Sequence, residues 1–266
     1  MSDSEYYDRF SEQSSEQQPL KTKKEKVDNS GVLSLAKVFG YMFIGLMITA
    51  AIALGLGYYF GNVLLAEAAT DVEARIQETN VIILLVALGV SFIGIIVLSF
   101  VVPIVAIKGK HSVLVPAIIY TILMGVMLST LTIFIDWLIL GMTFGITSLV
   151  FGLMAIIALL SKSRLNGLAI AAIGLFIGAG LISLVMWILM LVGVNVTPIY
   201  WIVSLAVFAA VMLITIWDMA RIKRIAQDGA MTKNLSLYCA FILYNDFINI
   251  FLRILRYVII IFGNRR

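Results

Sequence analysis

The chain has 266 residues, of which 62% are hydrophobic and 13% charged, and its mean hydropathy is +1.06. These values exclude an ordinary soluble globular domain and predict an integral membrane protein. The net charge of +4 comes from basic residues spread over loops, which favours contact with the lipid bilayer over nucleic-acid binding. A single cysteine, Cys239, excludes an intrachain disulfide framework.

The first thirty residues differ in composition from the rest of the chain. They are rich in Ser, Glu, Gln and Lys and nearly free of aliphatic side chains before Val27. Such a segment buries too little apolar surface to offset its ordering entropy, so residues 1–30 are predicted to form a disordered, charged cytoplasmic tail. The apolar run that follows is too long for a signal peptide, so we expect it to remain in the mature protein.

Seven long apolar runs follow, each near or above the roughly 20 residues that cross a hydrocarbon core of about 30 Å. Their continuous hydrophobicity favours helices over the alternating strands of a membrane barrel. The predicted spans are Ala36–Leu65, Val81–Ile107, Val113–Ile135, Trp137–Leu160, Leu168–Val192, Pro198–Trp217 and Leu235–Phe262. The sequence therefore predicts an all-α integral membrane protein with seven transmembrane helices in one domain, residues 31–266.

Basic residues concentrate in alternate connections between the spans. They precede the first span and follow the second, fourth and sixth, whereas the other connections are mainly acidic or uncharged. Because short loops rich in Lys and Arg stay cytoplasmic, this pattern predicts a multi-pass protein of the plasma (inner) membrane with a cytoplasmic amino terminus. Seven crossings place Arg265 and Arg266 outside, against this rule. A re-entrant last segment would remove the conflict, but Leu235–Phe262 is long enough to cross fully, and we favour a full crossing.

Only four acidic residues follow Glu78, and two of them belong to membrane helices. Asp136 and Asp228 are predicted in loops. Asp218 follows the sixth apolar run, in a helix that we expect to continue past it, and Asp246 lies within the seventh. The helical rise places the two carboxyls roughly 12 Å and 18 Å from the same membrane face. They can therefore meet between antiparallel neighbours joined by a short loop.

The seventh span also carries a polar stripe. It recurs at steps of three or four residues and consists of Ile242, Asp246, Asn249, Arg253 and Arg256, with Asn245 at its edge. Lipid offers no hydrogen bonds, so this face is predicted to point into the bundle or line a cavity. Two interpretations stay open, because Asp246 would either pair with a basic residue to lock the bundle or serve an ion or proton function.

Five glycines of the fourth and fifth spans are predicted to lie where neighbouring helices approach closely, since small residues permit such contacts in membranes. They are Gly145, Gly152, Gly174, Gly178 and Gly180.

Motifs in the last two helices resemble those of the Bax inhibitor-1 (transmembrane Bax inhibitor motif) family, and the chain resembles a bacterial member of it. "LYNDFINIFLRILR" is similar to the family's final-helix motif, and "WDMARIKRI" to its preceding motif, although Trp217 stands where Tyr is usual. The resemblance implies a central last helix ringed by six others, with Asp218 and Asp246 as a pH-sensitive latch on a calcium leak. The family's arginine near the end of span two is missing, so Lys108 or Lys110 would take its place.

The pH-sensitive role that the resemblance implies for the two aspartates agrees with the behaviour of two carboxyls held close together. They cannot easily both ionise, so Asp218 and Asp246 are expected to share a proton that holds spans six and seven together. Loss of that proton would separate the helices or create a transient calcium site, with Asn245, Asn249 and water completing the shell. Arg253 belongs to the same supporting polar set. We therefore expect a pH-sensitive calcium (cation) leak channel or transporter, with no catalytic residue and no bound cofactor.

Two other functions stay open. One is a non-catalytic regulator of a membrane protease or of membrane-protein quality control, with the charged tail as the contact element. The remote alternative is an intramembrane aspartyl protease, which also carries one aspartate on each of two successive helices. Its usual Gly-x-Gly-Asp and Pro-Ala-Leu motifs are missing here, because Asn245 precedes Asp246 and no proline follows. A retinal photoreceptor is excluded, because span seven has no lysine for a Schiff base.

Overall fold

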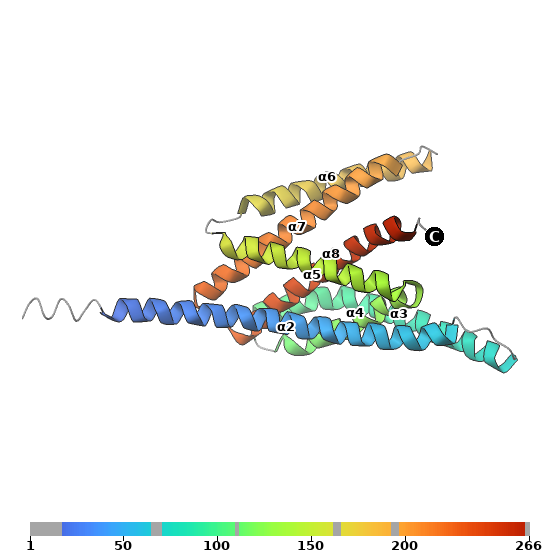
Figure 1. The fold of residues 1–266 in the computed structure, drawn as a ribbon, viewed down its shortest axis with the longest axis horizontal. Coiled ribbons are helices and arrows are strands. Elements are labelled where there is room, and N and C mark those ends of the chain that lie inside the picture. The colour runs from blue at the N-terminus through green and yellow to red at the C-terminus, as the bar shows by residue number, and fades with distance from the viewer. Residues whose placement is uncertain (1–17, 65–70, 110–111, 162–165, 193–196, 264–266) are drawn as a thin grey trace, which may run out of the picture.

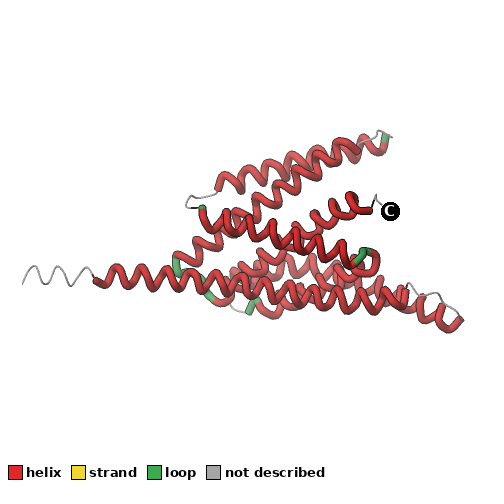
Figure 2. The backbone as a smooth tube through the Cα atoms, in the orientation of Figure 1, coloured by secondary structure: helices red, strands yellow, loops and turns green. Residues whose placement is uncertain are grey.

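The structure is a computed structural model that describes residues 18–64, 71–109, 112–161, 166–192 and 197–263. Throughout these ranges the chain forms helices joined by short connections, and no strand occurs in them (Figures 1 and 2). The helices are α2 (Gln18–Leu64), α3 (Asp71–Lys108), α4 (Leu114–Phe134), α5 (Trp137–Leu160), α6 (Asn166–Leu191), α7 (Thr197–Gln227) and α8 (Lys233–Gly263).

Each of the seven helices is long and apolar enough to cross a membrane. The predicted fold class, an all-α membrane protein with seven spans, is therefore confirmed. The expectation that the sixth helix continues past its apolar run is also confirmed, since α7 ends at Gln227. The turn after it contains Gly229 at φ +71°, a left-handed conformation that glycine adopts without steric cost.

The amino-terminal boundary differs from the predicted one. Helix α2 begins at Gln18, inside the segment predicted to be disordered, and its charged end projects beyond the bundle (Figure 1). Lys, Glu, Gln and Leu are good helix formers, so the first membrane helix can continue through this stretch. Residues 1–17 lie outside the described residues, and their disorder stays a prediction.

Helix α8 is the most enclosed of the seven. In the most apolar 18 residues of α8, 56% of the residues are buried, against 28% or less in the corresponding stretch of each other helix. It packs against α2, α3, α4, α5 and α7. Helix α6 packs against α7 and has no comparable interface with α8, so the expected ring of six helices around the last one is not formed. Figure 1 shows the α6–α7 pair leaning away from the other helices at one end.

The most extensive helix contact joins α2 to α4. The Thr49 hydroxyl donates to the Thr121 carbonyl at 3.0 Å, and the Thr132 hydroxyl lies 2.9 Å from the Ala53 carbonyl. Gly125 permits this approach, because a Cβ there would lie 2.8 Å from Cβ of Ile52.

The prediction of which glycines lie at close helix contacts was wrong. The close contacts involve other glycines than the five predicted ones. A Cβ added at Gly145, Gly152, Gly174, Gly178 or Gly180 meets no heavy atom within 4 Å. By contrast, a Cβ at Gly57 would overlap the Thr132 hydroxyl. Sequence alone cannot tell which face of an apolar helix meets a neighbour, so small residues were assigned to the wrong pair of spans.

Candidate functional site

The two aspartates singled out in the sequence face each other across α7 and α8. Asp218 is buried on α7, close enough to Asp246 of α8 for the two carboxyl charges to interact. Oδ2 of Asp246 is fully enclosed and has no hydrogen-bond partner. A buried carboxylate oxygen without a donor is costly, so this oxygen is the unusual polar group of the bundle.

Thr215 lies one turn before Asp218 and completes the site. It is fully buried, and its hydroxyl donates to the Val211 carbonyl at 3.0 Å. The same hydroxyl lies within hydrogen-bonding range of the Asp246 carboxyl. A threonine hydroxyl has one proton to donate, and here it is donated to the Val211 carbonyl. Thr215 can then offer Asp246 only a lone pair, so a hydrogen bond between them requires that Asp246 carries a proton.

The basic residue beside the pair is Arg221. It follows Asp218 by three positions on α7, its charge acts on that carboxyl, and its guanidinium lies 5.4 Å from the centre of the Trp217 ring. This role of Arg221 was not predicted, although a spacing of three residues on a helix signals such a contact in the sequence. Lys108 is exposed at the end of α3, and the structure does not bring it to the aspartates. Lys110 lies outside the described residues.

Asn245 holds helices together instead of facing the carboxyls. Its Oδ1 accepts a hydrogen bond from the Tyr120 hydroxyl at 2.7 Å, and its Nδ2 donates to the Phe241 carbonyl at 3.1 Å. Asn249 is exposed and Arg253 is half-buried. Among the described residues, no group of three or more His, Cys, Asp or Glu side chains is placed to hold a metal ion. The aspartate pair therefore offers few oxygen ligands compared with the six to eight that calcium takes.

A second buried network links α8 to α2 through Tyr244, two residues before Asp246. The hydroxyls of Thr49 and Tyr244 lie 2.6 Å apart, and Thr49 gives its only proton to the Thr121 carbonyl. Tyr244 must therefore be the donor to Thr49. The Tyr120 ring packs edge-on against Tyr244, with 6.1 Å between centroids. These polar contacts fix the rotation of α8 and hence the direction in which Asp246 points. The sequence offered no pattern that would have identified Thr49 or Tyr120.

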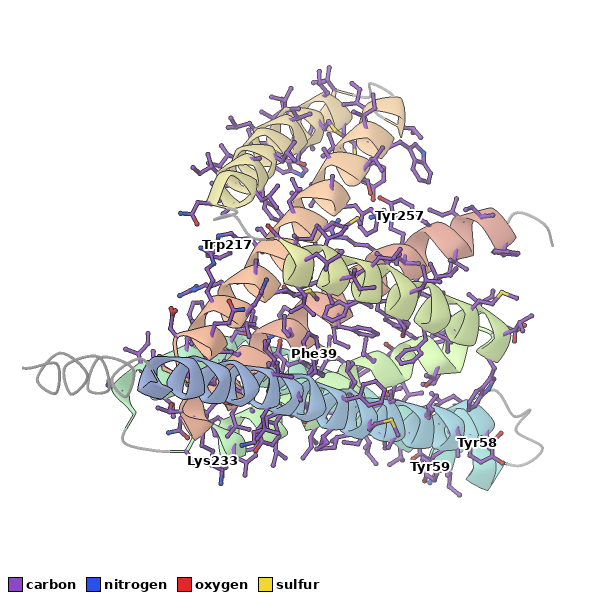
Figure 3. The ribbon with its side chains drawn as sticks, turned by 60° about the vertical axis from the view of Figure 1, so that its left-hand side comes forward. Phe39, Tyr58, Tyr59, Trp217, Lys233 and Tyr257 are labelled. Atoms are coloured by element: carbon purple, nitrogen blue, oxygen red, sulfur yellow. The ribbon has the colours of Figure 1, made fainter. Side chains whose placement is uncertain are left out.

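The polar stripe of α8 points inward at only one end. Asp246 faces the bundle, whereas Asn249 and Arg256 are exposed. The prediction that the whole face is enclosed was therefore wrong for these two residues. Beyond them, Tyr257 lies between α8 and α7 (Figure 3), where its ring stacks on Trp201 and its hydroxyl lies 3.1 Å from that of Ser204. The final turns of α8 are thus held by aromatic contacts to α7.

Comparison with known proteins places this bundle in a family. Residues 32–265 match the family described as "Inhibitor of apoptosis-promoting Bax1". The chain is 30% identical over 243 residues to "Inner membrane protein YbhL" of Escherichia coli strain K12, a match that covers 87% of this chain and 92% of that protein. The same values hold for the protein of that name in Escherichia coli O6:H1.

A shorter match reaches "Uncharacterized protein RP147" of Rickettsia prowazekii, with 33% identity over 151 residues, 56% of this chain and 60% of that protein. No solved structure is significantly similar to the chain. The family match covers the seven membrane-spanning helices and both aspartates, and it confirms the resemblance drawn from the last two motifs. The chain belongs to the Bax inhibitor-1 family of multi-pass membrane proteins.

Proposed function

We propose that the protein is a non-enzymatic, proton-controlled cation leak channel or transporter, with calcium as the permeating ion and Asp218 and Asp246 as its gate. The observation that carries the proposal is the enclosed, unpartnered Oδ2 of Asp246 opposite a second buried carboxyl. Two ionised carboxylates in such a place would be strongly unfavourable. One proton on the pair removes the repulsion, and when it resides on Asp246 it can be donated either to Asp218 or to Thr215, whose own proton is donated to the Val211 carbonyl.

Release of the shared proton is the step that would open the path. Both carboxylates would then be negative and would repel each other across the contact between α7 and α8. The repulsion can be relieved either by separation of α7 from α8 or by entry of a cation between the carboxylates. Because Asn245 is engaged by Tyr120, water must supply most of the remaining calcium ligands. Weak binding of this kind suits passage better than storage.

The setting of this proposal is the inner membrane, with the amino terminus in the cytoplasm. The name of the Escherichia coli relatives supports the membrane, and the basic connections after the second, fourth and sixth spans support the orientation.

Calcium uptake by proteoliposomes tests this function. The full-length protein would be reconstituted around a trapped calcium dye, beside Asp218→Asn/Asp246→Asn protein and protein-free liposomes. Native protein should give uptake well above the protein-free level, and the double substitution should change it. Native uptake equal to that of empty liposomes at every pH would refute the leak.

The second candidate function is regulation of a membrane protease or of membrane-protein quality control. The helical extension of α2 from Gln18 to Ser30 favours it, since roughly 20 Å of charged helix projects beyond the membrane span (Figure 1). A regulator should keep its partner when Asp218 and Asp246 are replaced and lose it when residues 1–30 are removed. The gate proposal predicts that removal of residues 1–30 leaves calcium uptake intact.

A further inference from the structure

The last turns of α8 place arginines where a membrane helix usually has none. Arg253 and Arg256 follow each other by three positions on one face. Arg256 is exposed, and Arg253 is half-buried. Residues 253–266 contain four arginines and no acidic residue. By the distribution of basic loops this end of α8 lies on the side where Lys and Arg are disfavoured, and the proposed gate does not account for it.

The depth of Arg256 can be read from its neighbours. It lies a little under two turns, roughly 9 Å, before the span ends at Phe262. Its guanidinium sits 4.8 Å from the ring centre of Tyr200, near the start of the α7 span at Ile199. Tyr and Trp side chains mark the level of lipid headgroups, and exposed Trp201 follows Tyr200. Arg256 is thus held at the headgroup level, and Arg253 lies one turn deeper.

These guanidiniums need an anion from outside the described bundle. Two like charges three positions apart on a helix repel each other, and a charge facing lipid is costly. Of the acidic residues after residue 74, all of which have described side chains, Asp246 faces Asp218, Asp228 lies beyond the opposite end of α7, Asp136 accepts the Leu138 amide as the N-cap of α5, and Glu78 is exposed on α3. A phosphate group matches two guanidiniums by charge and by bidentate geometry.

We propose that Arg253 and Arg256, with Tyr200 as a platform, bind the phosphate group of an anionic phospholipid in the leaflet that contains the carboxyl-terminal end of α8. The Tyr200 ring orients the Arg256 guanidinium before the lipid arrives, which lowers the ordering cost of binding. Bound lipid supplies the countercharge that the last turns of α8 otherwise lack. This site is separate from the aspartate gate, and its test requires no ion flux.

The test is native mass spectrometry of the full-length protein released from nanodiscs of phosphatidylcholine with graded phosphatidylglycerol. Native protein should retain phosphatidylglycerol in preference to phosphatidylcholine. Each lost arginine should weaken that retention by roughly tenfold, the range of a charge-assisted hydrogen bond. Retention of phosphatidylglycerol by Arg253→Lys/Arg256→Lys protein should fall between that of native and Arg253→Gln/Arg256→Gln protein. Lysine keeps the positive charge but lacks the planar guanidinium that binds a phosphate through two parallel hydrogen bonds.

The matched control is Lys233→Gln, which removes an exposed cation from the opposite end of the same helix. Arg256→Gln is the single variant to compare with it, because the exposed Arg256 side chain can be lost without opening the core. Equal retention of phosphatidylglycerol by Arg256→Gln and native protein would overturn the site. If inorganic phosphate displaces the lipid at millimolar concentration, the assignment to a lipid is overturned and a free-phosphate site replaces it.

Discussion

Replacing Gly125 with alanine should destabilise the protein, although alanine is the better helix former. An alanine Cβ at this position would lie 2.8 Å from Cβ of Ile52 and 3.0 Å from the Thr49 carbonyl oxygen. Unstrained carbon atoms sit about 3.5–4.0 Å apart, so α2 and α4 must separate by up to about 1 Å. Overpacking of this kind costs about 1–3 kcal/mol, against a gain of about 1 kcal/mol in helix propensity. We expect a net loss of up to about 2 kcal/mol.

Unfolding by SDS in mixed micelles, followed by circular dichroism, measures this change in free energy. Gly145→Ala is the matched control, because a Cβ on this α5 glycine meets nothing within 4 Å. It should be neutral or stabilising by up to about 1 kcal/mol. If the two substitutions change the free energy of unfolding by the same amount and sign, the close α2–α4 contact is wrong.

Two further substitutions test buried contacts by the same unfolding assay. Thr49→Val should cost more than Tyr244→Phe, since it leaves the buried Tyr244 hydroxyl without an acceptor, at about 1–3 kcal/mol, whereas in Tyr244→Phe the Thr49 hydroxyl still donates to the Thr121 carbonyl. The reverse order would contradict the donor direction assigned to this network. Lys223→Met should lower stability by about 1 kcal/mol, because the Lys223 ammonium donates to the Leu159 and Ser161 carbonyls at the end of α5. No change in the free energy of unfolding would show that this cap is not formed in the micelle.

The number of the helices could be predicted from the sequence because it depends on local chemistry. A run of about 20 apolar residues must form a helix if it crosses lipid, and each of the seven predicted spans corresponds to one observed helix. The continuation of α7 past Asp218 followed equally from helix-forming residues. The start of α2 was misplaced because a charged segment made of good helix formers can still be helical.

The arrangement of the helices could not be predicted in the same way, because uniformly apolar helices carry little information about which face meets which neighbour. The expected ring around α8 assigned α6 a place that its contacts do not support. The aspartate pair was predictable, since a charge in a membrane span requires an inward position and a partner. Its supporting residues were predictable only in part, because Arg221 follows Asp218 at helical spacing, whereas Thr215 becomes a neighbour of Asp246 only through the rotation of α7.

Calcium flux across a range of pH tests the central claim most directly. Native protein, Asp218→Asn, Asp246→Asn and Asp228→Asn would be reconstituted in dye-loaded liposomes, with Asp228 as the matched control because its side chain is exposed in the turn after α7. Native flux should rise with pH, because loss of the shared proton leaves two repelling carboxylates. Asparagine resembles the protonated acid, so flux through either pair variant should be low and nearly independent of pH, while Asp228→Asn follows the native curve. A native profile without pH dependence, or pair variants that retain the native profile, would contradict the proposed gate.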